Sequence, residues 1–194
     1  LGGKYRDKIR SYTYGYTDPE MPNSKGWMTP KVAAAHAKKF VDMGYTAVKL
    51  DPIPQVDRLG YPAGPWDMSL EMYYRAEDTI GAVREAVGRD IDILIGTHGQ
   101  ISPAWSVKLG RMLEQFNVAW FEEPTGPENP KDCAIVARAV NIPVATGERL
   151  CFSYEFQHLF EERACAIAQP DLGTVGGFTE FKKIAGMAEA NYIQ

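Results

Sequence analysis

The sequence lacks the features that would assign it to several large protein classes. No stretch approaches the roughly 18 consecutive apolar residues of a membrane-spanning helix, so we expect no membrane partner. Neither G-x-G-x-x-G after a strand pattern nor G-x-x-x-x-G-K-[ST] occurs, which removes the usual nucleotide-binding signals. The formal charge is −4, with 21 Lys and Arg against 25 Asp and Glu, and this balance argues against nucleic acid as a partner.

Cysteine is scarce, and its positions show no metal-site spacing. Cys133, Cys151 and Cys165 are therefore expected to be reduced thiols in a cytoplasmic protein, and no signal peptide pattern opens the chain. The 194 residues are 45% hydrophobic and 24% charged, which is enough for one sizeable globular core. Because the chain opens at Leu1 and stops within what looks like a new strand, we expect a fragment of a longer polypeptide.

Short apolar runs alternate with helical patterns along the whole chain. Strands are expected within residues 9–15, 46–50, 91–95, 118–122, 142–148 and 166–171, each followed by a helix. Six such units predict an α/β fold with a parallel sheet. A TIM-type (β/α) barrel and an open doubly wound sheet both fit this pattern, and the even spacing of polar strand ends favours the barrel.

Three of the apolar runs end in a carboxylate. Glu122 and Glu148 are 26 positions apart, and Asp171 follows 23 positions later. In a parallel barrel these points are the carboxyl ends of neighbouring strands, where such folds place their active sites. Acids that converge repel one another unless a hard cation neutralises them, and Mg²⁺ prefers carboxylate oxygens. The spacing therefore predicts a magnesium site.

Each of these acids also has a purely structural interpretation. Glu122 and Glu123 could be a solvated pair at the rim, and because strand residues alternate between faces we expect only Glu122 to point inward. Glu148 could form an ion pair with Arg149, although we favour a metal ligand with Arg149 holding a carboxylate in place. Asp171 could simply cap the entry to a helix.

Three further side chains at strand ends could carry chemistry. His98 lies between Gly96 and Gly99, and histidine titrates near neutrality, so it is a candidate general acid or base despite the usual structural role of a lone histidine. Lys49 and Asp51 flank one residue and share a strand face. They could form a rim salt bridge, or Lys49 could stabilise negative charge on a substrate carboxylate or enolate. The long loop that follows, with Tyr61 and Trp66, could contact substrate.

Four ordered motifs together resemble the enolase superfamily, in particular its mandelate racemase-like group with the acid-sugar dehydratases. The motifs are Phe121-Glu122-Glu123-Pro124, Gly147-Glu148-Arg149, Gln169-Pro170-Asp171 and Gly176-Gly177. The resemblance implies a modified TIM barrel, of which residues 1–194 would be strands one to six. The N-terminal capping domain and the last barrel strands would lie outside this chain.

The resemblance also implies roles for individual residues. Mg²⁺ would be the cofactor, with Glu122 and Glu148 as ligands, and His98 would be the acid that assists departure of a hydroxyl group. Asp171 would pair with a histidine from the seventh strand. Substrate-binding candidates are Lys49, Arg149 and Gln169. A small sugar acid would be the partner, and the full-length protein would be a homo-oligomer.

Two positions depart from the family pattern. Asp51 stands where some members have the second lysine of a Lys-x-Lys pair, which disfavours a lysine-based racemase. Gly96 stands where the dehydratases have an aspartate ligand, so Asp51, Thr97 or water would have to complete the metal shell. The expected reaction is dehydration of a sugar acid through an enediolate to a 2-keto-3-deoxy acid. A cycloisomerase, a racemase or epimerase, or a degenerate sugar-acid-binding protein are the alternatives.

Overall fold

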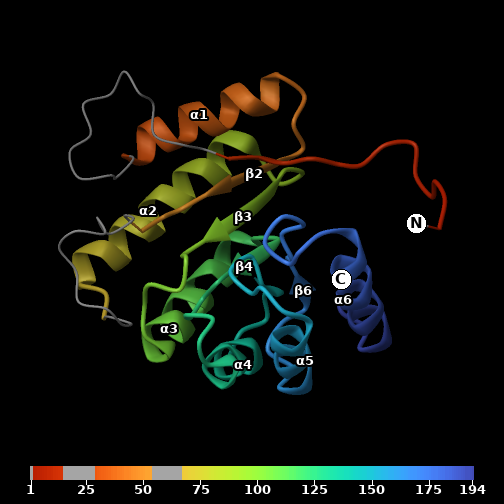
Figure 1. Cartoon of the computed structure of the whole chain (residues 1–194). Coiled ribbons are helices and arrows are strands. Elements are labelled where there is room, and N and C mark those ends of the chain that lie inside the picture. Colours follow the sequence, from red (N-terminus) through yellow and green to blue (C-terminus); the bar gives the residue numbers. More distant parts are fainter. Residues whose placement is uncertain (1, 15–28, 54–66) are drawn as a thin grey trace.

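A computed structural model describes residues 2–14, 29–53 and 67–194, and shows a parallel sheet covered by helices (Figure 1). The strands are β1 (Thr13–Tyr14), β2 (Ala47–Leu50), β3 (Asp92–Gly96), β4 (Trp120–Glu122), β5 (Val144–Thr146) and β6 (Ile167–Ala168). The helices are α1 (Pro30–Asp42), α2 (Leu70–Val87), α3 (Pro103–Leu113), α4 (Pro130–Ala139), α5 (Ser153–Glu161) and α6 (Phe178–Ala190), with a 3₁₀ turn, η1 (Glu114–Phe116), after α3. Tyr61 and Trp66 lie outside the described residues.

The order of the strands distinguishes between the two sheet types that the sequence left open. The described strands pair in strict sequence from β1 to β6, and every pair is parallel. A doubly wound sheet reverses its strand order at a switch point. Right-handed crossovers without a reversal leave the helices on one face, and Figure 1 shows them along the outside of the sheet. The prediction of six strands of a (β/α) barrel is confirmed.

Alternation along the strands separates a hydrophobic core from a polar interior. Val48, Leu50, Ile93, Ile95 and Phe121 are buried in the core cluster that includes residues of the covering helices. The residues between them point to the opposite face, because successive strand residues alternate. That inner face carries Lys49, Leu94 and Glu122. The sheet therefore presents polar groups to the inside of the barrel.

The helix boundaries follow local signals that the sequence contains. The Thr29 side chain accepts a hydrogen bond from the backbone N–H of Val32 at the start of α1, and Pro30 occupies the first helical position. Gly44 and Gly88 have φ of +99° and +78° just after α1 and at the end of α2. None of the helices in the described ranges combines the length and hydropathy of a bilayer-spanning segment.

Two strands are shorter than the sequence indicates, and this changes where their acids lie. The fifth strand ends at Thr146 rather than at Glu148, and the sixth at Ala168 rather than at Asp171. Gly147 turns the chain with φ of +126°, and its α-carbon has no room for a side chain because the Phe156 ring lies 2.8 Å from where a Cβ would be. Both acids therefore belong to loops after the strands.

The three cysteines are free thiols in two different environments. Cys133 and Cys165 are buried, and burial raises the pKa of each thiol to about 12. Cys133 also donates a hydrogen bond to the carbonyl of Ala164 at 3.2 Å. Cys151 is partly exposed in the loop before α5. Thiolate is the reactive form, so burial makes Cys133 and Cys165 unreactive and leaves Cys151 as the accessible thiol.

We therefore expect iodoacetamide at pH 8 to alkylate Cys151 in the native protein and to leave Cys133 and Cys165 unmodified, because the two buried thiols stay protonated. Peptide mapping by mass spectrometry measures each site separately. Denatured protein is the control and should be alkylated at all three positions. Rapid native alkylation of Cys165 would contradict the buried environment described above.

Candidate metal and substrate site

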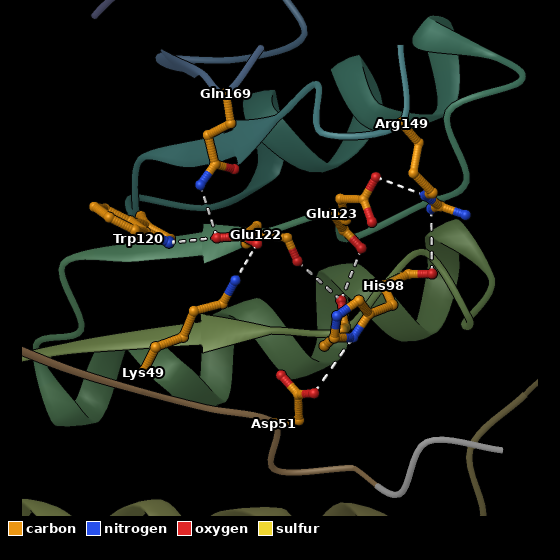
Figure 2. A network of polar contacts seen from close by, with 9 residues as sticks. Lys49, Asp51, His98, Trp120, Glu122, Glu123, Arg149 and Gln169 are labelled. Atoms are coloured by element: carbon orange, nitrogen blue, oxygen red, sulfur yellow. Dashed lines mark hydrogen bonds and ion pairs between the residues drawn. The ribbon is translucent and has the colours of Figure 1, made fainter. Parts of the chain in front are cut away.

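Polar side chains from five consecutive strands meet at the carboxyl-terminal mouth of the barrel (Figure 2). The close-up shows one connected network of polar contacts, and its labelled members are Lys49, Asp51, His98, Trp120, Glu122, Glu123, Arg149 and Gln169. These residues come from β2 and β4 and from the segments that follow β2, β3, β4, β5 and β6. The predicted convergence of strand-end residues is thus found in the structure for most of the candidates.

Glu122 is the centre of this network. Its side chain is only 2% exposed, and Lys49 Nζ forms an ion pair with Oε1. The other oxygen, Oε2, accepts hydrogen bonds from Trp120 Nε1 at 3.0 Å and from Gln169 Nε2 at 2.8 Å. A buried carboxylate with three donors is held in one orientation.

Lys49 is buried together with its partner. Burial by itself would lower the pKa of Lys49, but the hydrogen bond and charge of Glu122 outweigh burial, and the net pKa is raised. Glu148 adds a smaller contribution in the same direction. The ammonium group also lies 5.1 Å from the centroid of the Tyr14 ring. Lys49 therefore places a positive charge at the barrel mouth, next to Glu122.

Glu123 is also buried, contrary to the expectation that only one of the adjacent glutamates points inward. The alternation rule stops applying because β4 ends at Glu122 and the backbone of Glu123 turns left-handed, with φ of +43°. Glu123 Oε1 accepts from Arg149 Nε at 2.8 Å. Burial raises the pKa of Glu123 to about 7, against the lowering effect of Arg149, and a hydrogen bond with Glu148 adds to the increase.

The loop after β3 is attached to the end of β4 by backbone contacts. The Thr97 hydroxyl donates to the carbonyl of Glu123 at 2.8 Å, and the Gly99 N–H donates to the same carbonyl at 2.8 Å. Arg149 Nη2 donates to the carbonyl of His98 at 3.2 Å. The Thr97 hydroxyl therefore holds this loop against the end of β4. These contacts hold His98, whose φ is +52°, at the mouth.

His98 faces Asp51 across the end of β2. Its Nδ1 lies 3.4 Å from Asp51 Oδ2, and the side chains are 30% and 12% exposed. A carboxylate beside one ring nitrogen favours a proton on that nitrogen and orients the ring. The arrangement leaves Nε2 as the nitrogen available to a substrate. Geometry of this kind suits a histidine that acts as an acid or base.

Glu148 and Asp171 lie in different surroundings. Glu148 is partly buried and shares a hydrogen bond with Glu123. Asp171 is exposed, and its Oδ1 accepts from the Thr174 N–H at 2.7 Å, which holds the pKa of the carboxyl below its usual value. It therefore stabilises the turn before α6, whose own N-cap residue is Gly177, and it is not part of the network in Figure 2.

Sequence reasoning missed three contributors to the site. Trp120 donates to Glu122 from the same strand, two residues away, so a period-2 pattern could have suggested it. Tyr14 lies in the strand expected within residues 9–15, but its contact with Lys49 was not predicted, and the burial of Glu123 was excluded by assuming a continuous strand. Gln169 and Arg149 were expected to bind substrate, but their contacts here are with Glu122 and with Glu123.

The donor set fits a hard divalent cation in chemistry, although it is not gathered around one point. Among the described residues, no three His, Cys, Asp or Glu side chains are arranged to hold a metal ion together. Three carboxylates each face a basic side chain instead: Glu122 faces Lys49, Glu123 faces Arg149, and Asp51 faces His98. Glu148 faces Glu123, so the site holds more acidic than basic groups and suits an added cation.

Comparisons with known proteins identify what this chain is similar to. A family model described as "Enolase C-terminal domain-like" matches residues 32–194. The D-gluconate/D-galactonate dehydratase of Picrophilus torridus is 34% identical over 98% of this chain and 45% of its own length. The D-gluconate dehydratase of Thermoproteus tenax is 33% identical over 100% of this chain and 36% of its own length. The crystal structure of mandelate racemase/muconate lactonizing enzyme from Jannaschia sp. CCS1 shares 40% identity at a TM-score of 0.90, covering 100% of this chain and 49% of that one.

The raised pKa of Glu123 predicts a pH-dependent cost to folding. In the folded state the pKa of Glu123 is about 7, above the ordinary value of 4.5. Ionisation of Glu123 therefore lowers the free energy of unfolding, with no loss below about pH 4.5 and the full loss above about pH 7. Glu123→Gln removes this titration. The unfolding free energy of the wild type, measured by urea denaturation in chelator, should fall relative to that of the variant as pH rises from 4.5 to 7.

The charge control is Glu85→Gln, which removes the same charge from an exposed position on α2. A wild-type stability that rises relative to Glu123→Gln across this pH range would show that the folded protein stabilises the ionised form of Glu123 instead.

Proposed function

The chain belongs to the enolase C-terminal domain-like family, and on this premise we propose that the full-length protein is a Mg²⁺-dependent dehydratase of sugar acids. The observation that carries the proposal is the meeting of Glu122, Lys49 and His98 at the barrel mouth, in a chain similar to sugar-acid dehydratases. The reaction removes water from C2 and C3 of an aldonate and gives a 2-keto-3-deoxy acid.

This activity is proposed for a longer polypeptide. The chain spans about half the length, or less, of the curated relatives and solved structures that it matches. We propose that residues 1–194 contribute strands one to six of the barrel, and that a capping domain and the remaining strands complete the site. The free cysteines agree with a cytoplasmic location, and the homo-oligomeric state stays a prediction.

The metal ligands in this proposal are Glu122 and Glu148, at the mouth of adjacent strands. Bound Mg²⁺ would supply positive charge that stabilises the enediolate formed when the proton at C2 is removed. Lys49 has a long, flexible side chain, and its ammonium group can leave Glu122 and turn to the carboxylate of the substrate. Lys49 thus neutralises Glu122 in the resting protein and binds substrate in the complex.

His98 acts on the hydroxyl group that leaves. It donates a proton to the C3 hydroxyl, the C3–O bond breaks, and the hydroxyl leaves as water while the electron pair of the enediolate forms the C2–C3 double bond. The resulting enol tautomerises to the 2-keto acid. Arg149 and Gln169 complete the substrate contacts, and Asp171 orients a basic histidine supplied by a strand outside this chain.

The proposal is tested with the full-length enzyme and a panel of aldonates that includes D-gluconate, D-galactonate and D-xylonate. We expect at least one to yield a 2-keto-3-deoxy acid, measured by a colorimetric keto-acid assay, only when Mg²⁺ is present. Glu122→Gln should lose turnover and Mg²⁺ binding by calorimetry together, because a neutral amide is a poor ligand for Mg²⁺. No keto acid from an extended aldonate and aldarate panel would refute the dehydratase proposal.

His98→Asn separates the acid from the metal site. Asparagine tolerates the left-handed backbone of this position, so the fold should be retained. We expect kcat to fall by about 10²- to 10⁴-fold, the usual contribution of a general acid, while Mg²⁺ binding is weakened far less than in Glu122→Gln. His158→Asn, on α5, is the matched control and should leave kcat unchanged. Turnover that survives His98→Asn would assign the acid to another residue.

A further inference from the structure

We infer that Asp51 supplies a third carboxylate to the metal site and does so from β2, in place of a ligand on β3. The inference rests on the proposed metal-dependent function and assigns one more residue to it. Three features of the barrel mouth support it: the register of the strands, the space above Gly96, and the orientation of the Asp51 carboxylate.

The strand register places Asp51 level with Glu122. Leu50 pairs with Ile95, so the next residues along, Asp51 and Gly96, lie beside each other. Gly96 in turn pairs with Glu122 on β4. Asp51 follows the end of β2, and its carboxylate lies over Gly96 on the side to which the paired Glu122 points. The mouth therefore carries an acid on each side of a glycine.

The space above Gly96 is filled by the Asp51 carboxylate. A Cβ added to Gly96 would lie 2.6 Å from Asp51 Oδ1 and 3.1 Å from Lys49 Cε. Bond lengths of about 1.5 Å and 1.2 Å put an aspartate oxygen about 2.4 Å from its own Cβ. Asp51 Oδ1 therefore lies at about the distance from that Cβ at which the oxygen of an aspartate at 96 would lie, and glycine at 96 leaves room for the Asp51 carboxylate where it stands.

The second oxygen of Asp51 fixes the direction of the first. Oδ2 lies 3.4 Å from His98 Nδ1, so the carboxylate is held between the histidine and the space over Gly96. The side chain is 12% exposed, which limits the conformations it can adopt. One carboxylate thereby serves two functions: one oxygen orients His98, and the other faces the acids at the centre of the mouth.

Calorimetric titration of the full-length enzyme with Mg²⁺ tests the assignment without relying on turnover. Asp51→Asn keeps the shape and removes the charge, and should weaken binding by about 10- to 100-fold, the range seen when groups around a metal site are lost. Gly96→Ala keeps the charge but puts a methyl group 2.6 Å from Oδ1, which should displace the carboxylate and also weaken binding. The exchange variant Asp51→Gly/Gly96→Asp returns one carboxylate to this part of the mouth and should recover affinity to within about 3-fold of wild type, which is less than 1 kcal/mol.

Asp92→Asn is the control, since it removes one charge from the opposite end of β3, where Asp92 pairs with Arg10. It should bind Mg²⁺ as the wild type does. Wild-type affinity in both Asp51→Asn and Gly96→Ala would overturn the inference and leave Asp51 as a residue that orients His98 alone. An exchange variant that binds Mg²⁺ no better than Asp51→Asn would likewise overturn the inference, because a carboxylate at 96 would then fail to replace the one at 51. A wild type that binds no Mg²⁺ would instead refute the proposed function itself.

Discussion

The buried ion pair between Lys49 and Glu122 is the interaction on which the barrel mouth depends. Each partner is almost fully withdrawn from water, so either charge alone would be costly, and together with the Trp120 and Gln169 donors they form a satisfied group. Two neighbouring acids also lie beside basic side chains. Arg149 contacts Glu123 and His98 contacts Asp51, so the acids can be close together without a bound ligand. A cation that enters this site meets carboxylates already oriented by neighbours.

Much of the fold could be predicted from sequence because its signals are local. The Thr29-Pro30 start of α1 and the glycines after α1 and α2 each act within a few residues, and the alternation of strands and helices gave the parallel topology. The fifth and sixth strands were placed too long, because an acid that follows an apolar run looks the same whether it ends the strand or begins the loop. Glu148 and Asp171 belong to the second case.

The site was predictable in its members and much less so in its contacts. Glu122, His98, Lys49 and Asp51 were identified from strand-end positions, and the structure brings them together. Which donor contacts which acid depends on residues far apart in the chain, such as Gln169 and Glu122. It also depends on backbone turns that no sequence pattern predicts. The left-handed φ of Glu123 is the clearest case: one dihedral angle turns a residue expected at the surface into a buried acid.

The close fit of Asp51 over Gly96 makes the two positions dependent on each other during evolution. A side chain gained at 96 meets the Asp51 carboxylate, and a smaller residue at 51 leaves a gap that glycine cannot fill. Neither change is neutral while the other residue stays as it is. An acid gained at 96 avoids this contact only if residue 51 changes as well, and this mutual dependence favours keeping Gly96 and Asp51 together.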